Sequence, residues 1–275
     1  MIYAVWIPLL MPFLAVPAAR RLADALAPAR AVLLLTATGA GLALSGLLAL
    51  VLLVVPGATR FSLVSALGEL VRPLAGATPA VAVPLAAAAL ALLLGCATAV
   101  ARTVRRHWAE LGTAAPAEGP TDGELTVLPD SRPDAYALPG RPGTPGRIVV
   151  TTGMLHALDP AEREALLAHE RAHLTGRHHL FTVVAEAAAL CHPALRSLRA
   201  PMRYALERCA DEAAASAVGD RRIAARAIGR AALAARTAGS AAPTPPLFWS
   251  PQLNAAPADQ IRLLDVQALD VRLSQ

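Results

Sequence analysis

The pentapeptide His169-Glu170-Arg171-Ala172-His173 decides the fold of the second half of the chain. On an α-helix, residues four positions apart share a face, so His169 and His173 would project together and could bind one zinc ion. Glu170 would lie at the edge of that face, where a carboxylate can accept a proton from the water that attacks a peptide bond. This chemistry requires the pentapeptide to lie within a helix.

The sequence around the pentapeptide predicts such a helix over residues 159–175. Asp159 is a good N-cap, Pro160 suits the first helical position, and acidic residues fill the first turn. Gly176 is well placed to end the helix. Apolar residues continue at helical spacing through the segment, namely Ala165, Leu166, Ala168, Ala172 and Leu174.

A catalytic zinc site needs a third protein ligand and leaves its fourth position to water. Residues 206–218 predict a second helix, on which Glu207 and Asp211 share a face. We expect Glu207 to bind the metal. We expect Asp211 to accept a hydrogen bond from the outer nitrogen of a ligating histidine, because such a bond orients the ring and raises its basicity. The alternative is that both carboxylates are solvated beside Arg203 and Arg208.

A short β-sheet is predicted ahead of the zinc helix. Residues 147–152 are rich in β-branched side chains and follow a Gly- and Pro-rich loop at 139–146, so they read as a strand. Residues 125–128 and 135–138 are its candidate partners. Such a sheet either serves structure alone or presents an edge to an extended peptide.

Taken together, these motifs resemble the gluzincin membrane peptidases over residues 125–218. Two families share the outline: the BlaR/MecR-type antirepressor peptidases and the HtpX/CAAX type. Cys209-Ala210-Asp211 after Glu207, and His192-Pro193 between the two metal helices, are more similar to the BlaR/MecR type. The resemblance implies that Glu207 is the third ligand of one Zn²⁺ per chain. It also implies that an edge strand beside the zinc helix pairs with the substrate backbone.

The function that the resemblance implies is that of an integral-membrane zinc endopeptidase acting on a protein or peptide substrate. Regulated cleavage of a cytoplasmic transcriptional repressor is the activity of the BlaR/MecR type. One alternative is membrane quality control or prenyl processing of the HtpX/CAAX type. Another is an inactive, peptidase-like signalling protein, against which the full set of His169, Glu170, His173 and Glu207 argues.

Composition predicts a membrane protein, because 55% of the residues are hydrophobic and the mean hydropathy is +0.48. Three segments are long and uncharged enough to span a bilayer, at residues 2–19, 31–55 and 80–101. Three prolines in the first segment predict a kinked helix. The predicted fold class is therefore a mainly α membrane protein, in which three N-terminal transmembrane helices precede a helical gluzincin domain with a small β-sheet.

Arginine supplies all of the basic side chains, since the chain has no lysine. Arginines are more frequent after the first and third segments than in the loop at 56–79. The positive-inside rule then predicts a multi-pass protein of the cell membrane with its catalytic region in the cytoplasm. The net charge of +5 is attributed to arginines that face the lipid bilayer. No direct nucleic-acid binding is expected, because aromatic residues are only 4%.

The predicted organisation has four parts. A transmembrane region at 1–106 is followed by a linker at 107–123, the peptidase domain at 124–236, and a C-terminal part at 237–275. That last part contains a breaker segment and an amphipathic helix at 258–273, and another helix is expected on the outer surface within 56–79. Residues 180–191 are too short for a span and are predicted to form a core or membrane-leaning helix.

The remaining histidines and cysteines carry weaker expectations. His178 and His179 are expected at the surface, with a contact to the oxyanion as the alternative for one of them. Cys209 is expected to be buried, because its position on the helix differs from that of Glu207 by roughly 200°. The three scattered cysteines argue against a disulfide scaffold.

Overall fold

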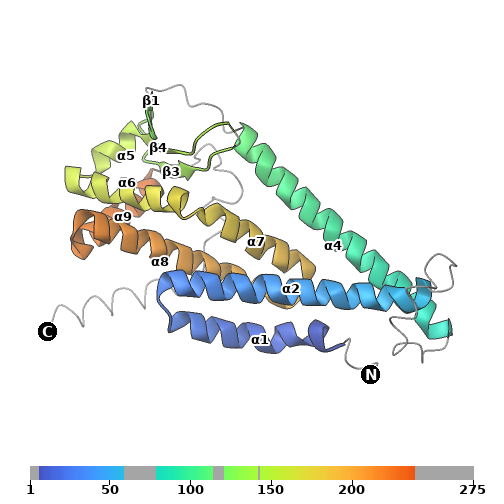
Figure 1. Ribbon diagram of the computed structural model, residues 1–275. Helices are drawn as coiled ribbons and strands as arrows, with labels where there is room; N and C mark the ends of the chain where they lie inside the picture. Colours follow the sequence, from blue (N-terminus) through green and yellow to red (C-terminus); the bar gives the residue numbers. More distant parts are fainter. Residues whose placement is uncertain (1–5, 59–78, 114–120, 142, 239–275) are drawn as a thin grey trace.

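The computed structural model describes residues 6–58, 79–113, 121–141 and 143–238. Within these ranges the chain is mainly helical, with one small sheet near the end of the longest helix (Figure 1). The predicted fold class is thus confirmed in its main features. The predicted helices at 258–273 and within 56–79 lie outside the described residues, apart from the ends of the latter segment.

Three helices form the N-terminal part: α1 (Trp6–Asp24), α2 (Pro28–Ala58) and α4 (Pro79–Thr113). Two of them contain stretches long and apolar enough to cross a membrane, Pro28–Val54 and Ala80–Ala109. The first predicted span is helical in α1, but α1 is not among the candidate spans found in the described residues. The prediction of three spans is therefore supported for two. Helix α4 continues through Thr113, so residues 107–113 of the predicted linker are helical.

The sheet has the strand order β1-β2-β4-β3. Its strands are β1 (Thr121–Asp122), β2 (Leu125–Leu128), β3 (Ala135–Leu138) and β4 (Arg147–Thr151). Strand β4 is parallel to β2 and antiparallel to β3, and Ile148, Val149 and Val150 are fully buried in it. All three predicted strands are present. The central strand ends one residue before its predicted limit, because the Thr151 hydroxyl accepts from the backbone N–H of Met154 and begins a helix.

The second half of the chain is a series of helices. They are α5 (Thr152–Ala157), α6 (Pro160–Thr175), α7 (His178–Cys191), the 3₁₀ helix η3 (Pro193–Leu198), α8 (Arg199–Val218) and α9 (Arg221–Thr237). Helix α6 begins with a capping box in which Asp159 and Glu162 each accept from the backbone N–H of the other. Its predicted start is confirmed, whereas α8 begins seven residues earlier than the predicted 206.

The largest buried cluster joins α1 and α2 to α7, η3 and α8. Its most buried large side chains are Leu35, Leu195, Leu198 and Met202. A Cβ added at Gly39 of α2 would lie 3.4 Å from Leu198 Cδ1 and 3.7 Å from Ala188 Cβ, so alanine would fit there but a larger side chain would meet the core. Figure 1 shows α7 between α2 and α4, and both helices contact it. The predicted helix at 180–191 is therefore a core helix, and it packs directly against both candidate spans.

Candidate metal centre

Two helices that pack against each other, α6 and α8, supply the predicted site residues. The Nε2 atoms of His169 and His173 on α6 lie 3.2 Å apart. Oε2 of Glu207 on α8 lies 3.5 Å from the first of these atoms and 3.9 Å from the second. All three donor atoms fall within 4.8 Å of one another. Glu207 lies 34 positions after His173 in the chain. The structure nevertheless brings together the three side chains that the sequence predicts as ligands.

One side of this cluster is open and the other is closed. His169 and His173 are buried, whereas the Glu207 side chain is 58% exposed. Asp211 lies one turn further along α8, with Oδ1 3.1 Å from His169 Nδ1. A proton held on Nδ1 by this contact leaves the lone pair of His169 Nε2 directed at the cluster. The exposed side chain of Glu207 marks the side of the cluster that solvent reaches.

The electrostatics of the cluster favour a cation. Burial acts to lower the pKa of His169, but hydrogen bonds to Asp211 and Glu207 outweigh it and raise the pKa to about 10. Burial lowers the pKa of His173 to about 3, so this imidazole is neutral and its lone pair is available. The same two carboxylates that favour a proton on His169 would favour a divalent cation in its place, because both are positive charges.

Glu170 lies beside this cluster and against the sheet. Burial raises the pKa of its carboxyl to about 7, and the charge of Glu207 acts in the same direction, while His169 and the backbone N–H of Ala137 oppose them. Its Oε2 atom is buried and has no hydrogen-bond partner among the described residues. A carboxylate whose pKa lies near neutrality is suited to accept and return a proton.

The donor set fits zinc. Two imidazole nitrogens and one carboxylate oxygen are a ligand set that catalytic zinc takes in proteins, with the remaining position left for water. The cluster meets this requirement in atom type, in number and in its one open side. His169, His173 and Glu207 are the residues that would hold the ion.

His178 does not lie where its sequence predicts. The sequence predicts a surface position, but His178 is only 6% exposed, and its Nδ1 lies 2.8 Å from Nδ1 of His173. His179 is half-buried, with its ring stacked 5.9 Å from that of His107. His178 is five positions after His173, and the end of α6 lies between them. The spacing of residues along a single helix therefore does not predict this contact.

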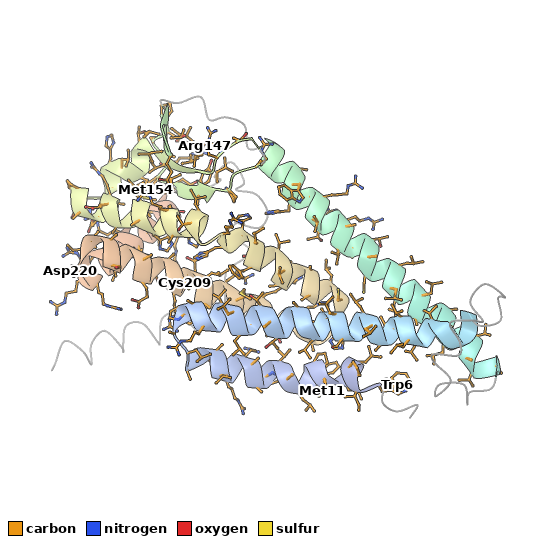
Figure 2. All side chains as sticks on the ribbon, in the orientation of Figure 1. Trp6, Met11, Arg147, Met154, Cys209 and Asp220 are labelled. Carbon is orange, nitrogen blue, oxygen red and sulfur yellow. The ribbon has the colours of Figure 1, made fainter. Side chains whose placement is uncertain are left out.

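Cysteine takes no part in the cluster. The three cysteines are free, and none is among the grouped metal-ligand atoms of the described residues. Cys209 packs against the buried cluster that α2 and α8 share, on α8 in Figure 2. Its half-buried position agrees with the expectation that Glu207, and not Cys209, faces the two histidines.

Comparison with known proteins gives one match. The model of peptidase family M48 matches residues 98–200, a stretch that includes His169, Glu170 and His173 and ends before Glu207. This match confirms the resemblance to membrane zinc metallopeptidases of the BlaR and HtpX type and supports metallopeptidase activity. No curated protein and no solved structure matches the chain.

Proposed function

We propose, from the match to peptidase family M48 and the geometry of the cluster, that this chain is an integral-membrane zinc endopeptidase. The observation that carries the proposal is the convergence of His169, His173 and Glu207 beside a buried Glu170. The two candidate spans support the membrane location. The arginine distribution supports a cytoplasmic catalytic region.

In the proposed reaction each side chain has one task. Zinc, when bound, supplies a Lewis acid that polarises the scissile carbonyl. His169, His173 and Glu207 hold the ion, and Asp211 keeps the ring of His169 in the orientation that ligation needs. Glu170 accepts a proton from the attacking water and returns it to the departing amine.

Among the described residues, strand β3 forms an edge of the sheet beside the proposed catalytic carboxylate. Strand β3 lies at the end of the strand order and contacts α6. The backbone carbonyl of Asp134 accepts a hydrogen bond from the backbone N–H of Thr151 at the end of β4. Because the backbone groups of successive residues in a strand point in opposite directions, those of Ala135 and Ala137 face away from β4. An extended substrate could pair with the carbonyls on this edge, and the backbone N–H of Ala137 already lies next to Glu170.

Two classes of protein substrate follow from the resemblance. Cleavage of a cytoplasmic repressor corresponds to the BlaR/MecR type, to which Cys209-Ala210-Asp211 and His192-Pro193 are similar. Membrane-protein quality control or prenyl-tail processing corresponds to the HtpX/CAAX type. A membrane span across residues 180–191 would favour the second class, but α7 is a shorter apolar helix and is not among the candidate spans of the described residues. Incubation with a soluble repressor-like protein and with an unfolded membrane protein would separate the two classes.

The activity is tested with the full chain purified in detergent. Glu170→Gln should retain stoichiometric zinc, measured by mass spectrometry, and should lower the rate of casein cleavage about 10²- to 10⁴-fold, because the general base is lost. Glu164→Gln is the matched control, since Glu164 lies on the same helix with its side chain exposed. Absence of zinc from the unchanged protein, or full activity of the Glu170 variant, would contradict the proposal.

A further inference from the structure

The turn between α6 and α7 returns a histidine to the metal centre. Nδ1 of His178, the first residue of α7, lies 2.8 Å from Nδ1 of His173, and the two rings meet edge to face with centroids 4.7 Å apart. Both side chains are buried. This contact uses the nitrogen of His173 that faces away from Glu207 and His169.

Ligation of a metal by His173 through Nε2 would assign a proton to one nitrogen of each ring. His173 presents Nε2 to the cluster, at 3.2 Å from His169 Nε2, so a ligating His173 must keep the Nε2 lone pair free and hold its proton on Nδ1. That Nδ1–H then donates to His178 Nδ1. His178 must therefore accept at Nδ1 and carry its own proton on Nε2. The contact selects the tautomer of His173 that can bind a metal.

The backbone of the turn is shaped to allow this contact. Gly176 has an ordinary φ of −74°, so its conformation does not require glycine. A Cβ at this position would lie 2.5 Å from His178 Nε2 and 2.7 Å from Cδ2, so glycine is needed to leave room for the ring. Arg177 has a φ of 49°, the one positive φ of a non-glycine residue in the described part of the chain. Arg177 therefore adopts a left-handed backbone conformation that is unfavourable for a non-glycine residue, at the point where the chain turns and places His178 against His173.

We propose that His178 is a positioning residue for the metal ligand His173, and that the Gly176-Arg177 turn exists to place it. The inference rests on the proposed zinc site. His178 does for His173 what Asp211 does for His169: each places an acceptor atom near the outer nitrogen of a ligand, at 2.8 Å and 3.1 Å respectively, and so fixes the orientation of its ring. The site is then supported from both sides, by a carboxylate on α8 and by a neutral imidazole on α7.

The test measures metal binding to the full-length protein in detergent. Zinc affinity is obtained by competition with a chromophoric chelator, and the ligand geometry is read from the visible spectrum after cobalt(II) substitution. His178→Leu should weaken zinc binding about 10- to 100-fold and change the cobalt spectrum, because loss of such a supporting group has effects of this size. His178→Asn places an oxygen near the position of Nδ1 and should restore most of the affinity, whereas His178→Gln should not.

The control is His179→Leu, which removes the neighbouring histidine on the same helix. It should leave zinc affinity within about threefold, since a large loss of affinity requires the removal of a group that contacts a ligand. Gly176→Ala provides an independent arm. It should weaken zinc binding in the unchanged background, because the new Cβ displaces the His178 ring. It should have a smaller further effect in the His178→Leu background, where the crowding of the His178 ring is gone and only the contact of the new Cβ with the backbone oxygen of Ala172, at 2.9 Å, remains.

The outcomes separate this inference from the function on which it rests. If the unchanged protein binds no zinc, the proposed function fails and this inference fails with it. If the unchanged protein binds zinc and His178→Leu binds it equally, with the same cobalt spectrum, only the role of His178 is overturned. If His178→Leu does not fold, as judged by circular dichroism, the comparison of the Asn and Gln variants decides: equal affinities for those two would overturn the role.

Discussion

Replacing Arg230 with alanine removes the partner of a buried carboxylate at the start of α6, the helix that carries His169 and His173. Glu162 is only 1% exposed, and its Oε2 lies 2.6 Å from Nη1 of Arg230 on α9. The second terminal nitrogen of the same guanidinium donates to the carbonyl oxygen of Ala157 at 2.9 Å. One arginine therefore ties α9 to the cap of α6 and to the end of α5.

The cost of this substitution can be worked from these contacts. Removal of one partner from a fully buried ion pair costs about 3–5 kcal/mol. Arg230 is 52% exposed, and Arg226 lies 4.0 Å from the other oxygen of Glu162, so solvent and the second arginine reduce the loss. We expect a destabilisation of about 2–3 kcal/mol. For a chain of this size that corresponds to a fall in Tm of about 4–12 °C.

Thermal unfolding in a fixed detergent, followed by intrinsic fluorescence, measures the shift. Arg221→Ala is the matched control, because Arg221 lies on the same helix and forms a two-pronged pair with Glu212, but its side chain is 76% exposed. We expect no resolvable change in Tm for this variant. A shift for the Arg230 variant no larger than that of the control would refute the reasoning from burial.

Three further substitutions probe other parts of the molecule. Asp211→Asn should weaken zinc binding about 10- to 100-fold in chelator competition, because the charge behind His169 is lost while the size is kept; unchanged affinity would exclude the role. Gly39→Leu should lower the free energy of unfolding by about 1–3 kcal/mol, because Leu198 leaves no room; a Tm equal to that of the parent would count against the packing. A photo-crosslinker in place of Tyr136 on β3 should capture casein, and the same probe at exposed Arg222 should not.

The parts of the fold that the sequence predicted are those that local signals determine. The start of α6 follows from Asp159, Pro160 and Glu162, since a capping box involves only neighbouring residues. The shared face of Glu207 and Asp211 follows from their spacing on a helix, and the structure places both against His169. The roles of these residues in catalysis stay predictions until the variants are measured.

The features that the sequence did not predict depend on tertiary contacts or on a single backbone angle. Helix α8 extends back to Arg199, because Pro201 in its first turn needs no hydrogen-bonded N–H and Met202 packs into the core beside α2. The contact of His178 depends on the φ of Arg177, which no spacing of apolar residues reveals. Apolar content alone suggested a first span, yet the candidate spans in the described residues lie in α2 and α4.

The packing of α2 against η3 and α8 has a practical consequence for the design of truncated proteins. A fragment that begins after α4 would lose the helices that cover Leu195, Leu198 and Met202. An uncovered strip of this kind drives self-association in water. The second half of the chain therefore depends on the apolar helices α1 and α2 for its solubility. Biochemical work should keep the two halves joined.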